Sequence, residues 1–191
     1  MKIISYNVRG LGGFEMRSEV GRILSEKKPY VLCLQETKLT VVDDVLFQSL
    51  WPNPSVGFSF QLSIGASGGI LTAWDHNVVE VWSMSRLPHV LVIRGRVIQT
   101  GQEFIIANVN APCDTAAKQL LWDTLLPFVI HNSNAILCLC GGFNYVRSSE
   151  ERKGQGTIFR QHDSGIFNKF IDDGFFGGFA DLWEIIHLVS R

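Results

Sequence analysis

The stretch Ala135-Ile136-Leu137-Cys138-Leu139-Cys140-Gly141-Gly142-Phe143-Asn144 runs from an apolar segment directly into a polar loop. Residues 135–139 are continuously apolar, which predicts a buried strand. The loop holds two glycines, and Gly142 at its centre has no side chain that could hold water, bind metal or accept a proton. The sequence therefore predicts a buried strand that ends in a glycine-containing loop.

Short apolar runs alternate with helix-spaced apolar positions along the rest of the chain, which predicts a layered α/β or α+β domain. Strands are predicted over residues 2–7, 30–34, 58–62, 69–74, 78–84, 90–98, 103–109 and 135–139, and helices over 15–27, 43–51, 164–171 and from 114 onward. The strands between 58 and 109 are typical of one antiparallel meander. The tail from Phe175 onward has no clear pattern.

Composition is typical of one globular domain covering residues 1–191. The chain is 46% hydrophobic and 18% charged, a balance that favours a buried core over disorder. Its net charge of −1 creates no global basic field, so binding of nucleic acid would have to rest on a local patch. The four cysteines show no CxxC spacing and are interpreted as structural.

The amino-terminal residues lack the apolar core and cleavage site of a signal peptide. No run in the sequence approaches the roughly 18 apolar residues that a membrane-spanning helix requires. The sequence therefore predicts an intracellular chain, nuclear or cytoplasmic, with no membrane partner.

Two polar residues stand at the ends of predicted strands. Glu36 follows the apolar run 31–35, and a carboxylate there is a suitable hard-oxygen ligand for Mg²⁺, although a strand-end glutamate is more often a solvated charge. Asn7 ends the first predicted strand and could complete the metal shell with its amide oxygen, or simply form a turn. The neighbouring Arg9 and Lys38 are candidate phosphate contacts, or ordinary surface charges.

Three segments together carry a resemblance to a known family: Ser5-Tyr6-Asn7-Val8-Arg9-Gly10, Leu34-Gln35-Glu36-Thr37-Lys38 and Gly141-Gly142-Phe143-Asn144. They resemble the endonuclease/exonuclease/phosphatase family, and most closely the endonuclease domains of plant-like LINE-type retrotransposons. The resemblance covers roughly residues 1–173. It implies a four-layer α/β (α+β) sandwich, in which two mixed β-sheets pack face to face with helices outside, and a Mg²⁺-dependent (or Mn²⁺-dependent) endonuclease acting on DNA.

The same resemblance implies roles for individual residues. Glu36 and Asn7 would hold the metal, and Asn144 would contact the phosphate. Gly142 stands where the family has an aspartate that orients or activates water. Asn110, in Asn108-Val109-Asn110-Ala111-Pro112, stands where the family commonly has a tyrosine, whose phenolic reach and acidity an amide lacks.

The family closes with a Ser-Asp-His segment after further strands, and no such segment occurs in this sequence. We therefore expect a domain that is incomplete at its C-terminus, with a divergent tail over residues 175–191, an exposed sheet edge and a tendency to self-associate. Metal binding is expected to be weak and catalysis impaired or lost. The alternatives are a residual metal-dependent nuclease and a non-catalytic relic that binds nucleic acid.

Overall fold

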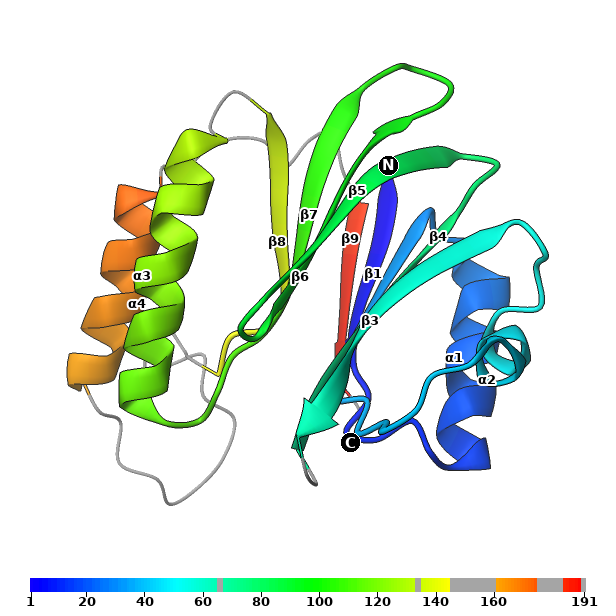
Figure 1. Ribbon diagram of the computed structural model, residues 1–191, viewed down its shortest axis with the longest axis horizontal. Coiled ribbons are helices and arrows are strands. Elements are labelled where there is room, and N and C mark those ends of the chain that lie inside the picture. Colours follow the sequence, from blue (N-terminus) through cyan, green and yellow to red (C-terminus); the bar gives the residue numbers. More distant parts are fainter. Residues whose placement is uncertain (65–66, 133–134, 145–160, 175–183, 190–191) are drawn as a thin grey trace.

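The computed structural model describes residues 1–64, 67–132, 135–144, 161–174 and 184–189. Two sheets pack face to face, and a pair of helices covers the outer face of each sheet (Figure 1). The strands are β1 (Lys2–Asn7), β2 (Val31–Gln35), β3 (Val56–Ile64), β4 (Ser67–Asp75), β5 (Val79–Leu87), β6 (Val90–Val97), β7 (Glu103–Asn110), β8 (Ile136–Gly142) and β9 (Glu184–Val189), and the helices are α1 (Phe14–Lys27), α2 (Asp44–Leu50), α3 (Thr115–His131) and α4 (Gln161–Asp173). The predicted four-layer sandwich is confirmed.

Both sheets are mixed. The first has the strand order β3-β4-β2-β1-β9, in which β1 runs parallel to β2 and β9, while β2 and β3 run antiparallel to β4. The second has the order β5-β6-β7-β8, antiparallel except for the parallel pair β7 and β8. The crossovers that parallel pairs require are made by α1 between β1 and β2 and by α3 between β7 and β8.

The predicted single meander over residues 58–109 is wrong. β3 and β4 belong to the first sheet, whereas β5, β6 and β7 form the meander of the second. β4 is already paired with β2 on one side and β3 on the other, so it has no edge left for β5. The chain therefore turns after Asp75 and starts the opposite sheet.

The tail also differs from expectation, because β9 pairs in parallel with β1, from Lys2 with Glu184 to Asn7 with Val189. Ile186 and Leu188 of this strand pack on the outer core of the first sheet. A six-residue strand with no turn signal beside it gives a weak pattern, which is why the sequence did not reveal it. The rest of the predicted divergent tail, residues 175–183 and 190–191, lies outside the described residues.

Three apolar clusters hold the layers together. One lies between the first sheet and helices α1 and α2, and a second lies between the second sheet and helices α3 and α4. In the second cluster Trp122 of α3 is 2% exposed, and its ring centroid lies 5.3 Å from that of Phe167 and 4.9 Å from that of Phe170, both on α4. The third cluster fills the space between the sheets and includes Ile3, Trp74, Phe104 and Ile106.

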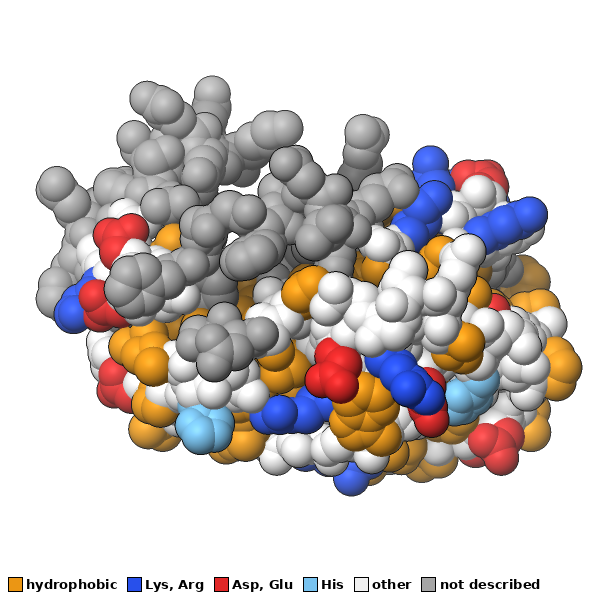
Figure 2. Space-filling view, turned by 90° about the horizontal axis from the view of Figure 1, so that it is seen from above, with side chains coloured by type: hydrophobic (Ala, Val, Ile, Leu, Met, Phe, Trp, Pro, Cys, Tyr) orange, Lys and Arg blue, Asp and Glu red, His pale blue; other side chains and the backbone are white. Residues whose placement is uncertain are grey.

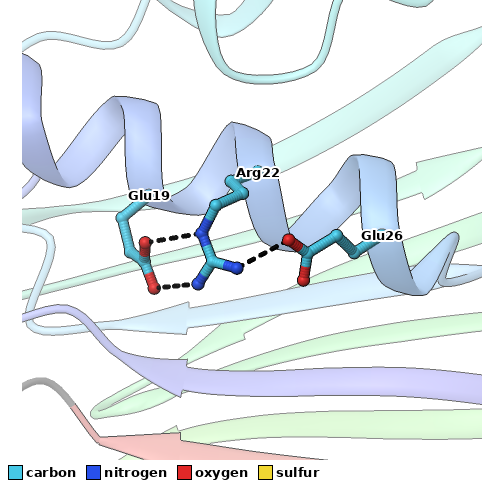
Figure 3. Close-up of polar contacts among 3 residues, drawn as sticks. All are labelled: Glu19, Arg22 and Glu26. Atoms are coloured by element: carbon cyan, nitrogen blue, oxygen red, sulfur yellow. Dashed lines mark hydrogen bonds and ion pairs between the residues drawn. The ribbon is translucent and has the colours of Figure 1, made fainter.

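The exposed face of α1 is held by charge pairs. Arg22 donates to Glu19, with an Nη2 to Oε1 distance of 2.9 Å, and to Glu26, with an Nη1 to Oε1 distance of 2.6 Å (Figure 3). The hydrogen bond from Arg22 lowers the pKa of Glu19. Pairs spaced three and four residues apart on an exposed helix contribute little to stability, so substitutions here serve as neutral controls.

Gly95 of β6 is required by the close approach of β5. A Cβ at this position would overlap the carbonyl oxygen of Glu80 and lie 3.0 Å from Cζ of Phe104, beside the register shift between Val81 and Ser83. We expect Gly95→Ala to lower the free energy of unfolding by about 2–3 kcal/mol, because the methyl group overpacks the strand pair. Urea denaturation measures this, and Gly12→Ala, whose added Cβ would have no neighbour within 4 Å, is the control.

None of the helices in the described part of the chain is both long and apolar enough to cross a bilayer.

Candidate active site

Four strands from both sheets end at one edge of the sandwich. β1 and β2 end together, since Asn7 pairs with Gln35, and β7 and β8 end together, since Asn110 pairs with Gly142. β1 runs from the N-terminus at the top of Figure 1 to this edge at the bottom. Successive side chains of a strand alternate between its faces, and Asn7, Asn110 and Gly142 share the parity of residues that face the opposite sheet.

Asn7 and Glu36 lie in direct contact. The Asn7 side chain donates from Nδ2 to Oε1 of Glu36 at 2.8 Å, and its Oδ1 accepts the backbone N–H of Arg9 at 3.2 Å. The amide therefore joins the turn that follows β1 to the carboxylate that follows β2. Glu36 is half-buried, and its carboxylate is held in one orientation by this contact.

The turns at this edge have unusual backbone conformations. Arg9, Glu36 and Lys38 all have left-handed φ values, of 50°, 53° and 54°. The second turn is pinned to the start of β4, because the backbone N–H of Lys38 donates to the carbonyl of Gly68 at 3.1 Å. Left-handed conformations of residues other than glycine store strain and cluster at functional sites. The side chains of Arg9 and Lys38, each two residues after Asn7 or Glu36 in the chain, are exposed.

Asn7, Glu36 and Asn110 form the polar group at these strand ends that we call the strand-end cluster. Gly142 lies next to its two asparagines. A Cβ built on Gly142 would lie 3.7 Å from Nδ2 of Asn7 and 3.9 Å from Oδ1 of Asn110, both ordinary van der Waals distances. Its φ is not in the left-handed region, unlike that of Gly141, which is +132°. A side chain at position 142 would therefore extend into the polar cluster without backbone strain.

Asn110 is 9% exposed, and its backbone N–H donates to the carbonyl of His89 at 2.9 Å. Asn144 lies two residues after the end of β8. It has a left-handed φ of 52° and an exposed side chain. Its Nδ2 donates to the carbonyl of Ala111, and its own carbonyl accepts a hydrogen bond from Lys118 Nζ at 2.8 Å. Asn144 thus ties the loop after β8 to the loop after β7 at the rim of the cluster.

Sequence reasoning missed a buried polar network directly beneath these residues. Gln35 Nε2 donates to Asn108 Oδ1 at 2.7 Å, and Asn108 Nδ2 donates to Thr72 Oγ1 at 3.1 Å. Both amide side chains are fully buried. The available signal was a set of polar residues at inward-facing positions of otherwise apolar strands: Ser5, Gln35, Thr72 and Asn108.

The oxygen atoms available at the cluster are suitable ligands for a hard cation that is held by few protein groups. They are the Glu36 carboxylate and the amide oxygens of Asn7 and Asn110, and Mg²⁺ typically takes one or two carboxylates together with water and substrate phosphates. In the part of the chain that the structure describes, no group of three or more His, Cys, Asp or Glu side chains is arranged to hold a metal. The residues present are of a kind that could hold a hard cation together with water and substrate oxygens.

Three of the four cysteines are buried, in agreement with a structural role for these three. Cys33, Cys138 and Cys140 are buried between the sheets, and Cys113 is exposed. A hydrogen bond to Cys140, together with burial, raises the pKa of Cys138, which keeps this thiol neutral. A neutral, buried thiol is a poor metal ligand and a poor nucleophile.

The opposite end of the sandwich carries other polar groups. A hollow there is lined by residues that include Gln102, Glu103, His131 and Asn132, and β4 ends at the same end with Asp75, which His76 follows. Figure 2 shows this face, and in its described part acidic, basic and hydrophobic side chains are interspersed. These groups are therefore separate from the strand-end cluster.

Two mixed sheets in a four-layer α/β sandwich, with carboxylate and amide groups gathered at converging strand ends, define the structural class of this protein. The chain belongs to the Endonuclease/Exonuclease/phosphatase family, which matches residues 4–185.

Solved structures share the fold at low sequence identity. The AP endonuclease LMAP from Leishmania major superposes with a TM-score of 0.72 and 17% identity over 90% of this chain and 66% of that chain. The Xenopus laevis APE2 catalytic domain superposes with a TM-score of 0.66 and 15% identity, over 88% of this chain and 67% of that chain. An AP endonuclease from Archaeoglobus fulgidus superposes with a TM-score of 0.60 and 18% identity, over 88% of this chain and 69% of that chain. A search of curated protein sequences found no match. The chain spans 66% of the length of the L. major enzyme.

Proposed function

We propose that this chain is a DNA phosphodiesterase domain, an endonuclease by origin, whose hydrolytic step is impaired because position 142 carries glycine. The observation that carries the proposal is the position of Gly142: an added Cβ would lie between Asn7 and Asn110, at 3.7 and 3.9 Å. A carboxylate there would face the Asn7 and Glu36 pair across the cluster. Hydrolysis of a phosphodiester needs a group to orient or deprotonate water, and glycine offers none.

The remaining residues have separable roles in this proposal. Glu36 would hold Mg²⁺, which when bound supplies positive charge to neutralise a phosphate. Asn7 orients Glu36 through the 2.8 Å hydrogen bond and offers its amide oxygen to the metal's shell. Asn110 contributes an amide where the family commonly has a tyrosine. The amide is a weaker proton donor than the tyrosine hydroxyl.

Contacts to the nucleic-acid backbone are assigned to the rim. Arg9 and Lys38 are exposed beside the carboxylate, on adjacent turns: an added Cβ at Gly10 would lie 3.6 Å from Cδ of Lys38. Asn144 would donate to a phosphate oxygen from the second hydrogen of its Nδ2, which in the structure has only the weak acceptor Cys113 Sγ at 3.9 Å. Cationic and amide groups around a strand-end cluster suit a phosphodiester backbone.

The choice of DNA as substrate is supported by the names of the structural neighbours, which include AP endonucleases from two organisms. The sequence segments around Asn7, Glu36 and Asn144 support a more specific origin in the endonuclease domain of a plant-like LINE-type retrotransposon. Translating the flanking genomic DNA in all three frames tests this origin. A reverse-transcriptase region downstream, in or out of frame, would support it, and unrelated flanking sequence would contradict it.

Metal binding at Glu36 can be measured without any catalysis. We expect Glu36→Gln to weaken Mn²⁺ binding by more than about tenfold, because it removes the carboxylate from the cluster. Electron paramagnetic resonance of free Mn²⁺ gives the affinity. Glu26→Gln, which removes an equal charge from the exposed face of α1, is the matched control and should bind as the unmodified chain does.

Nicking of supercoiled plasmid in Mg²⁺ tests the impaired activity. We expect no cleavage by the unmodified chain above that of Glu36→Ala. Cleavage that EDTA and Glu36→Ala both abolish would contradict impairment and favour a residual nuclease instead. Plasmid that is retained by the chain but never nicked would favour a relic that only binds nucleic acid.

A further inference from the structure

The space between the two sheets changes character along the strands. At the end far from the cluster it is apolar, with Ile3, Trp74, Val79 and Phe104 in contact across the sheets. One to two residues below the candidate site it becomes polar, although it remains fully buried: Ser5, Gln35, Thr72 and Asn108 are each 0% exposed. Buried polar groups are costly unless they are hydrogen-bonded, so a polar layer at this depth calls for an explanation.

Asn108 is the centre of this layer. It belongs to β7 of the second sheet, but its side chain bonds only to the first sheet in the contacts that the structure shows. Its Oδ1 accepts from Gln35 Nε2 at 2.7 Å, and its Nδ2 donates to the carbonyls of Leu34 at 3.3 Å and Leu71 at 3.1 Å and to Thr72 Oγ1 at 3.1 Å. One side chain thus reaches β2 and β4 across the interface.

The partners of this contact are the immediate neighbours of the site. Gln35 directly precedes Glu36 and pairs with Asn7 in the first sheet. Asn108 lies two residues before Asn110, on the same face of β7, and pairs with Cys140 two residues before Gly142. The contact therefore joins the strand ends that carry Asn7 and Glu36 to the strand ends that carry Asn110 and position 142.

We propose that Asn108 and Gln35 are positioning residues, which set the separation of the metal-binding half of the site on the first sheet from the phosphate- and water-binding half on the second. This inference rests on the proposed function for the identity of the two halves. The site spans an interface between sheets, and apolar packing resists separation without fixing the lateral position of one sheet against the other. Hydrogen bonds from one amide side chain to two strands of the opposite sheet fix that position.

The alternative is that Asn108 and Gln35 only hold the two sheets together. Replacing both residues by apolar ones distinguishes this cohesive role from the positioning role. Replacing both partners of a buried hydrogen bond by apolar groups of similar shape leaves stability nearly unchanged. The double variant Gln35→Met/Asn108→Leu replaces both partners of the Gln35–Asn108 bond by apolar side chains that can pack between the sheets, while the acceptors on Leu34, Leu71 and Thr72 lose Asn108. Asn53→Ala is the control, since it removes a partly buried hydrogen bond to Asp75 at the opposite end of the first sheet.

Amide hydrogen exchange gives a readout that needs neither metal nor substrate. Two amides report on the site edge, Val8, which donates to Gln35 at 3.1 Å, and Ala111, which donates to Gly142 at 2.8 Å. Two report on the far end, Asp75, which donates to Tyr30 at 3.1 Å, and Ile98, which donates to Val78 at 3.0 Å. We expect exchange in the double variant to rise about tenfold or more at the site edge and to stay within about threefold at the far end.

An equal rise at both ends would show a cohesive role only and would overturn the proposal, as would no rise at either end. Should the double variant fail to fold, Gln35→Met alone is measured in the same way, because Asn108 keeps its other three bonds in it. A local rise supports positioning in that variant as well, and a uniform or absent one overturns it.

Activity gives the second readout, in a Gly142→Asp background. We expect the double variant to lower kcat for plasmid nicking about 100-fold with KM unchanged, because a displacement of about 1 Å between reacting groups costs that much. Equal kcat values with and without the double variant would overturn the positioning role. If the Gly142→Asp chain itself does not nick, the proposed function fails, and the exchange measurement still decides the role of Asn108.

Discussion

A Gly142→Asp variant is expected to nick supercoiled plasmid in Mg²⁺ at least about 100-fold faster than the Glu36→Ala background, which the unmodified chain is expected not to exceed in the same assay. The added Cβ would lie 3.7 Å from Asn7 Nδ2 and 3.9 Å from Asn110 Oδ1, and its backbone carries no left-handed strain. The carboxylate would supply the group that orients or deprotonates water, an effect worth roughly 10²- to 10⁴-fold. Initial nicking rates over a range of Mg²⁺ concentrations measure it.

Gly142→Asn is the matched control, because asparagine fills the same volume without a basic oxygen pair. It should nick no faster than the unmodified chain, and adding Glu36→Ala to Gly142→Asp should abolish the gain. Equal rates for the Asn and Asp variants would refute a role for the carboxylate. No nicking by a folded Gly142→Asp chain would contradict the proposal that glycine at position 142 causes the impairment, and Gly142→Asp/Asn110→Tyr would then test whether Asn110 causes it instead.

Gly141→Ala is expected to have the largest effect on stability, lowering the free energy of unfolding by about 4 kcal/mol or more. Its φ of +132° is a conformation that only glycine adopts readily. An added Cβ would overlap the carbonyl oxygen of Val109 and lie 2.8 Å from its carbonyl carbon. Val109 is held between β6 and β8, so β8 could relieve the overlap only by moving away from β7 and breaking the ladder that joins them.

Urea denaturation followed by circular dichroism measures this loss, and a domain of this kind has only about 5–15 kcal/mol in total. The adjacent Gly142→Ala is the control and should unfold within about 1 kcal/mol of the unmodified chain, since surface-like substitutions without a clash have small effects. Similar midpoints for both variants would contradict the structural difference between the two glycines.

Most of the fold could be predicted from the sequence, because its signals are local. Asp43 and Asp114 were predicted to begin helices, and each caps one: Asp43 accepts from the backbone N–H of Leu46 at 2.7 Å, and Asp114 from that of Ala117 at 2.9 Å. Which strands pair with one another was harder to predict from the sequence. Periodicity identifies a strand but not its partner, so the division of the meander at Asp75 and the placement of β9 beside β1 required the structure.

The convergence of the candidate site residues could be inferred for the same reason, while their roles stay predictions. Asn7, Glu36, Asn110 and Gly142 follow or end apolar strands, and the structure brings them to one edge. What could not be predicted is long-range: the bond between Asn7 and Glu36 joins residues 29 apart, and that between Gln35 and Asn108 joins residues 73 apart. The use of Asn144 to tie two loops together is equally a property of the fold.

The contrast between the two adjacent glycines has an evolutionary consequence. Backbone geometry leaves position 141 no choice of residue, whereas position 142 has room for a side chain. Glycine and aspartate codons can differ by a single base, so a lineage can lose or regain the carboxylate in one mutational step without passing through a misfolded protein. Selection for folding therefore leaves position 142 free to drift, and only selection for hydrolysis would hold an aspartate there.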